Sequence, residues 1–142
     1  MVTVEPPRIG TPFPILVPQV DADGNGLAGV RMPELAVPLA TYTGWNLFND
    51  RSGPTSALSS MQGSYIPLPR TTVERKKSSD PRQAIDERYH DKQQYLGLVS
   101  KAARDLIGAR LLLEEDLDAI VRNAGRHWDL ATAPATSSTA QR

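Results

Sequence analysis

Apolar residues follow helical spacing in the second half of the chain, where they recur every three or four positions. The first such stripe consists of Tyr95, Leu98, Val99, Ala102, Leu106 and Ala109, and the second of Leu117, Ile120, Val121, Ala124 and Trp128. Asp91 precedes the first stripe as an N-cap residue would, and residues 111–113 end it. The acidic residues 114–116 precede the second stripe, where carboxylates favour the positive end of a helix dipole. We therefore expect two C-terminal helices.

The first 70 residues show no helical stripe, and they contain ten of the 12 prolines. Proline fixes φ and lacks a backbone N–H, so this half is expected to be extended rather than regular helix or central sheet. Two short apolar runs, at 15–20 and 27–32, flank the turn-forming residues 21–26, and this arrangement predicts a β-hairpin. Residues 33–46 are expected to continue the extended region.

Shorter signals lie in the middle and at the end of the chain. Residues 49–63 have the composition of a mobile loop, and residues 64–69 are expected to return to the core as a short extended piece. Residues 71–74 predict a short capped turn. Residues 80–89 predict a helix, because Asp at the N-cap and Pro at the first helical position are both favoured. The tail from residue 131 has nothing to bury and is expected to be disordered.

These patterns predict an α+β fold in one structural unit. A proline-rich extended and β-hairpin region, residues 1–70, packs on two to three α-helices in a helical region, residues 71–130. Residues 131–142 form the disordered tail. At 142 residues, the chain is about the length of one domain.

Composition excludes several kinds of partner and chemistry. Acidic and basic residues balance at 16 each, and the chain has no cysteine. Disulfides, thiolate metal sites and cysteine nucleophiles are therefore excluded, and no net charge attracts nucleic acid or an acidic membrane. The basic run 75–77 is interpreted as a solvated helix face. With no apolar run of the roughly 20 residues that span a bilayer and no signal-peptide pattern, we expect a soluble, cytoplasmic protein without nucleic-acid or membrane partners, and no cofactor.

Residues 21–26 are compatible with two interpretations, a calcium site and a plain turn. Asp21, Asp23 and Asn25 match the opening of a calcium-binding loop. The match fails at the twelfth position, where Met32 stands in place of a bidentate Glu. Prolines on both sides also disfavour the flanking helices of such a loop. The hairpin turn is the favoured interpretation, and no metal site is predicted.

No complete catalytic group is visible in the sequence. The nucleophile motif G-x-S-x-G does not occur, and Ser64 has a glycine on one side only. His90 would share a helix face with Asp86 and Glu87, which is interpreted as a solvated salt-bridge cluster. His127, near a helix end, is interpreted as a packed residue. An esterase using Ser64 and one of the histidines is the least favoured hypothesis, and no catalytic residue is predicted.

The uncharged stretch 36–46 offers the candidate pocket or interface. Its residues Tyr42, Trp45 and Asn46 combine two aromatic rings with an amide, next to a glycine that favours a turn. A large aromatic beside a glycine is more often a packing anchor than a ligand platform, and this interpretation is favoured for Trp45.

Several blocks of the chain resemble the C-terminal part of a group of large bacterial α/β-hydrolase-domain proteins. These blocks are residues 14–25, 28–34, 37–46, 63–67, 80–82 and 87–89. The resemblance runs from about Val2 to about Asp129 and is strongest over residues 14–46.

The resemblance implies that the nucleophile serine and the catalytic histidine lie upstream of the matched region. The chain is accordingly expected to be the C-terminal segment of a truncated or split hydrolase, active on esters only together with a missing upstream region. Its expected partners are that upstream hydrolase domain or a second copy of itself. The alternative hypothesis is a stand-alone protein-binding module that uses the surface from Tyr42 to Asn46.

Overall fold

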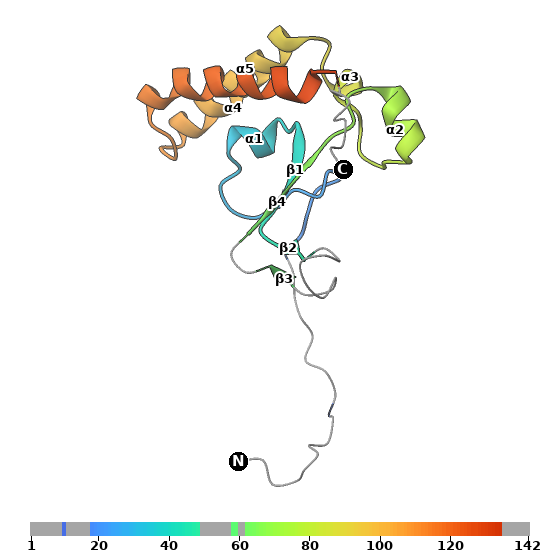
Figure 1. The fold of residues 1–142 in the computed structure, drawn as a ribbon. Coiled ribbons are helices and arrows are strands. Elements are labelled where there is room, and N and C mark those ends of the chain that lie inside the picture. Colours follow the sequence, from blue (N-terminus) through green and yellow to red (C-terminus); the bar gives the residue numbers. More distant parts are fainter. Residues whose placement is uncertain (1–9, 11–17, 49–57, 60–61, 135–142) are drawn as a thin grey trace, which may run out of the picture.

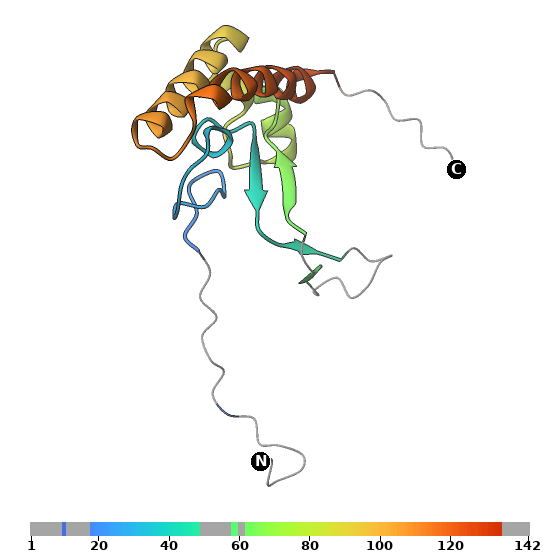
Figure 2. The same cartoon turned by 90° about the vertical axis from the view of Figure 1, so that its left-hand side faces the viewer.

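The computed structural model describes residues 10, 18–48, 58–59 and 62–134, and it confirms the α+β class. The described elements are α1 (Pro33–Ala36), β1 (Ala40–Thr43), β2 (Asn46–Leu47), β3 (Leu58–Ser59), β4 (Ser64–Pro67), α2 (Thr72–Ser78), α3 (Ile85–Arg88), α4 (Lys92–Gly108), a 3-10 turn (Glu114–Asp116) and α5 (Leu117–Thr132). Helices α4 and α5 lie side by side at one end of the molecule, and the strands lie beneath them (Figures 1 and 2).

Two antiparallel ribbons make up the described sheet structure. In the first, β1 pairs with β4, and Tyr42 lies opposite Tyr65. In the second, β2 pairs with β3. Side chains cap both outer edges of the first ribbon. Asn25 bonds to the outer edge of β1, whereas on β4 the Arg82 guanidinium donates to the carbonyl oxygens of Ile66 and Pro67. Capped edges resist pairing with strands of other molecules.

The hydrophobic core lies between the first ribbon and the two long helices. Its buried side chains are Val37, Leu39, Leu68, Ile85, Tyr89, Tyr95, Val99 and Ala124. Tyr95 and Val99 stand four positions apart on α4 and are each only 1% exposed. Full burial of an aliphatic or aromatic side chain of this size stabilises the fold by about 1.5–3 kcal/mol. The ring of Trp128, on α5, packs against both Tyr89 and Tyr95.

The helical half follows its predicted signals closely. The Asp91 carboxylate accepts a hydrogen bond from the N–H of Gln94 and caps α4. Thr71 caps α2 by accepting from the N–H of Glu74. The second stripe forms α5. Among the described helices, none is long and apolar enough to cross a membrane.

Two predicted helix limits are wrong in the helical half. Helix α4 ends at Gly108 rather than at residues 111–113, and α5 continues to Thr132, beyond the predicted start of the tail. Residues 135–142, and with them most of the predicted disordered tail, lie outside the described residues.

The helix predicted from Asp80 is also shorter than expected. The Asp80 carboxylate accepts from the N–H of Arg82 and pairs with its guanidinium, which makes a local turn instead of a helix N-cap. Helix α3 begins only at Ile85, where the Glu87 carboxylate accepts from the N–H of Ala84.

The proline-rich half departs further from its prediction. The predicted hairpin is present but short: Val20 bridges Gly26 in antiparallel fashion, and the N–H of Leu27 donates to the carbonyl oxygen of Gln19 at 3.0 Å. The part of the first run at 15–17 lies outside the described residues. Residues 33–36 are not extended, because Pro33 occupies the first position of α1, where its missing N–H is not needed. Within the predicted loop 49–63, residues 58–59 form β3, and residues 49–57 and 60–61 are outside the described part.

Candidate functional site

One surface hollow gathers two of the three candidate residues. It has a volume of about 790 Å³, and we name it the Tyr42–Trp45 hollow. Its lining consists of Pro18, Val20, Gly24, Gly26, Leu35, Tyr42, Thr43, Gly44 and Trp45. Among these described lining residues, none is an Asp, Glu, Lys, Arg or His. Hollows of roughly 300–1,000 Å³ with aromatic and apolar walls are typical of binding sites.

The turn at residues 21–25 forms one wall of this hollow. The Asp21 carboxylate accepts hydrogen bonds from the N–H groups of Asp23 and Asn25, both at 2.9 Å. Gly24 adopts φ = +79°, a conformation that side chains disfavour, and it lies against the Thr41 methyl group. The turn is thereby held against β1.

The carboxylates of this turn already have partners of their own. Burial alone would raise the pKa of Asp21, but hydrogen bonds from Arg31 and from the backbone lower it overall. Asp23 pairs with Arg88 from α3, and the fully buried Asn25 bonds to β1. The oxygens that resembled a calcium loop therefore hold the turn in place. Within the described part of the chain, no cluster of three or more metal-ligating side chains was found.

Tyr42 and Trp45 reach the hollow from β1 and from the bend that follows it. Burial raises the pKa of Tyr42 to about 12, so the phenol is neutral near pH 7. Its ring packs edge-on against Tyr65, with centroids 5.5 Å apart. Trp45 is 55% exposed, which corrects its interpretation as a packing anchor.

Asn46 does not belong to the hollow. Its side-chain oxygen accepts a hydrogen bond from the N–H of Leu47 at 2.8 Å. Its backbone forms β2 and pairs with Ser59. Of the three candidates, the structure thus brings Tyr42 and Trp45 together and leaves Asn46 in the second ribbon.

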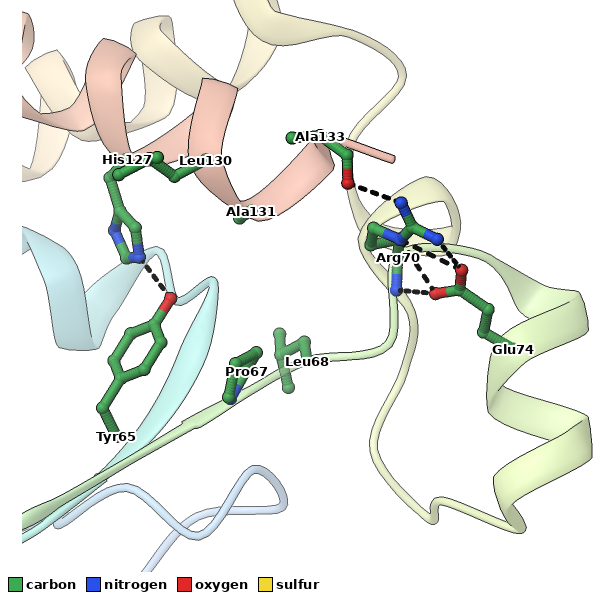
Figure 3. Close-up of a pocket in the computed structure, with 9 residues that line it drawn as sticks. All are labelled: Tyr65, Pro67, Leu68, Arg70, Glu74, His127, Leu130, Ala131 and Ala133. Carbon is green, nitrogen blue, oxygen red and sulfur yellow. Dashed lines mark hydrogen bonds and ion pairs between the residues drawn. The ribbon is translucent and has the colours of Figure 1, made fainter. Parts of the chain in front are cut away.

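A second hollow, of about 560 Å³, lies between β4 and α5 (Figure 3). Its lining consists of Tyr65, Pro67, Leu68, Arg70, Glu74, His127, Leu130, Ala131 and Ala133. The Tyr65 hydroxyl lies 2.6 Å from Nε2 of His127 and joins the strand to the helix. Burial lowers the pKa of His127 and raises that of Tyr65, so both groups favour the neutral form.

The other side of this hollow is an ion pair. The Arg70 guanidinium binds the Glu74 carboxylate and also donates to the carbonyl oxygen of Ala133 (Figure 3). Sequence reasoning missed this hollow. Tyr65 and His127 are 62 positions apart, and neither belongs to a motif.

Among the described residues, Ser64 and the two histidines do not assemble into a nucleophile and its base. Ser64 Oγ donates to the carbonyl oxygen of Trp45 at 3.0 Å. Successive strand residues point to opposite faces, so Ser64 faces away from the side on which Tyr65 meets His127. His90 is highly exposed and its Nδ1 lies 3.2 Å from the Asp91 carboxylate.

Asp86 and Glu87 do not join His90. Both carboxylates lie on α3, where Asp86 accepts from the N–H of Thr72 and Glu87 pairs with Arg75. Across the residues that the structure describes, the hydrogen bonds link no serine to a histidine.

Comparison with known proteins gives one match. A family model described as an alpha/beta hydrolase domain matches residues 3–122. Neither the curated proteins nor the solved structures contain a significant match.

Proposed function

The chain belongs to the alpha/beta hydrolase domain family, and from this premise we propose that it is a C-terminal segment of a hydrolase-like protein without independent catalysis. A hydrolase of this kind places its nucleophile serine on a sharp turn between a strand and a helix, within reach of a histidine. The G-x-S-x-G pattern of that turn is absent from the sequence. The chain would contribute to a hydrolase by packing against a catalytic region supplied from elsewhere.

The observation that carries this proposal is that the side chains of Ser64 and His127 form hydrogen bonds with different partners and not with each other. Ser64 donates to a backbone carbonyl oxygen on one face of the ribbon, and His127 bonds to Tyr65 on the other. A serine is a weak nucleophile unless a base takes its proton, and the two groups would have to meet for that. Ester hydrolysis by this pair is therefore not expected.

Exposed apolar side chains support a role in packing against another region. Among the described residues, large apolar side chains with more than a third of their surface exposed occur in both halves of the chain, and in the proline-rich half they are Val20, Leu27, Val30, Met32, Trp45, Leu47, Tyr65 and Ile66. Exposed apolar surface of this kind is available to pack against another region.

The test is hydrolysis of a short-chain p-nitrophenyl ester. The purified chain is assayed alone and mixed with an upstream segment that carries the G-x-S-x-G motif. We expect no activity from the chain alone above that of its Ser64→Ala variant, and activity in the mixture. Hydrolysis by the chain alone that is lost in both Ser64→Ala and His127→Gln would overturn the proposal, and an inactive mixture would also count against it.

A further inference from the structure

The Tyr42–Trp45 hollow has the features of a site for an extended, proline-containing peptide. The rings of Tyr42 and Trp45 line it without packing against each other, and Pro18 and Leu35 contribute further apolar walls. Grooves lined by aromatic side chains bind proline-rich segments, because such segments are extended before binding and lose little entropy. The half-exposed Trp45 leaves its indole available to a partner.

The uncharged lining of the hollow indicates which kind of ligand it can bind. The residues that the structure describes in this lining carry no carboxylate, ammonium, guanidinium or imidazole, and the phenol of Tyr42 is neutral near pH 7. A charged ligand would lose hydration in this hollow without finding a partner. The occupant is therefore an uncharged apolar segment.

The chain itself contains a segment of this chemistry. Residues 9–17 carry no charge and include Pro12, Phe13 and Pro14. Acidic and basic residues balance at 16 each, so net charge does not keep two copies apart. We propose that the Tyr42–Trp45 hollow binds the proline-rich segment around Pro12 and Pro14 of a second copy of this chain.

This contact joins two different surfaces, a segment on one copy and a hollow on the next. Such head-to-tail contacts produce either a closed dimer, in which two copies exchange segments, or an open-ended oligomer that grows with concentration. Docking is independent of whether the chain hydrolyses esters, so the ester assay and the binding assays below can fail separately.

The first experiment uses a labelled synthetic peptide of residues 9–17, whose binding to the full chain is followed by fluorescence anisotropy. We expect saturable binding that weakens at least about tenfold in Trp45→Ala, because an aromatic anchor carries much of the energy of such contacts. Leu98→Ala, which shortens an exposed side chain on α4 away from the hollow, is the matched control and should bind normally. A peptide with alanine at both Pro12 and Pro14 should bind at least about tenfold more weakly.

A second measurement locates the contact at Trp45. In a Trp128→Phe variant, Trp45 is the single tryptophan of the chain. Peptide binding should then shift its emission to shorter wavelength, as expected when an indole leaves water. Circular dichroism of each variant confirms that it is folded, so that loss of binding is not loss of structure.

The third measurement is the mass of the full chain by light scattering over a range of concentrations. We expect the mass to rise with concentration, and the rise to be suppressed by Trp45→Ala and by excess peptide. A chain that stays monomeric and does not bind the peptide overturns the proposal. Peptide binding that is unchanged in Trp45→Ala also overturns the proposal. Trp45 emission that is blue-shifted equally at all chain concentrations overturns it too, because the hollow would then bind the segment of its own copy.

Discussion

The side-chain oxygen of Asn25 accepts a hydrogen bond from the backbone N–H of Tyr42 at 2.8 Å. The amide nitrogen of the same side chain donates to the carbonyl oxygen of Ala40 at 3.1 Å. One asparagine thus replaces a neighbouring strand along the outer edge of β1. Because Asn25 is fully buried, this contact fixes the turn that walls the Tyr42–Trp45 hollow.

Replacing Asn25 with alanine should destabilise the fold by about 2–4 kcal/mol, because the substitution leaves a buried acceptor and a partly buried donor on β1 unpaired. Urea unfolding followed by circular dichroism measures the loss. The matched control is Asn46→Ala, whose side chain bonds only to the adjacent N–H of Leu47 and should change stability by less than about 0.5 kcal/mol. Equal losses in the two variants would contradict the role assigned to Asn25.

Acid should weaken the fold through His127. Burial lowers the pKa of this histidine in the folded chain below its ordinary value of 6.5, and Glu34 opposes the shift in part. The unfolded chain therefore binds a proton more readily, and stability falls as the pH drops from about 6.5 through the lower folded pKa. Because the side chain is only half-buried, we expect the loss to stay below about 1 kcal/mol.

The measurement is urea unfolding of the wild type and of His127→Gln at a series of pH values between 7 and 5. In His127→Gln, the free energy of unfolding should depend less steeply on pH than in the wild type. In His90→Gln, which changes an exposed position, the pH dependence should stay as in the wild type. An unchanged slope in His127→Gln would show that other groups cause the acid sensitivity.

The two long helices could be predicted because their signals are local. Tyr95 and Val99 repeat with the helical period, and Asp91 caps the helix through a residue only three positions away. Such contacts depend on short stretches of sequence, so pattern and capping chemistry suffice to find them. Only the ends of α4 and α5 were misplaced.

The proline-rich half was harder to predict because distant contacts determine it. The side chain of Asn25 bonds to backbone groups 15 and 17 positions away, and no local sequence pattern predicts that an amide side chain will cap a strand edge. The sequence predicts an extended segment from residue 33 onward, but Pro33 occupies the first helical position of α1, which tolerates proline. The second hollow depends on Tyr65 meeting His127 from the far end of the chain, which periodicity alone does not reveal.

The ion pair between Arg88 and Asp23 should contribute more to stability than a surface pair does. Both side chains are largely buried, and the pair joins α3 to the turn beside the Tyr42–Trp45 hollow. Arg88→Ala should destabilise the fold by about 2–4 kcal/mol, because a carboxylate then stays buried without its partner. Breaking the exposed pair of Lys101 with Asp105 by Lys101→Ala should have an effect below about 1 kcal/mol. A double-mutant cycle on each pair tests this difference, and similar coupling energies for both pairs would contradict it.

Two glycine-to-alanine substitutions should change stability in opposite directions. A methyl group at Gly63 would overlap the carbonyl oxygen of Thr43, next to the start of β4, so Gly63→Ala should destabilise the fold by about 1–3 kcal/mol. Gly97 lies exposed within α4 with nothing near its missing side chain, and Gly97→Ala should stabilise the helix by about 0.5–1 kcal/mol, because alanine loses less backbone entropy. Thermal unfolding of the two variants and the wild type measures both effects. A rise in melting temperature for Gly63→Ala would show that the chain just before β4 does not approach Thr43 of β1 this closely.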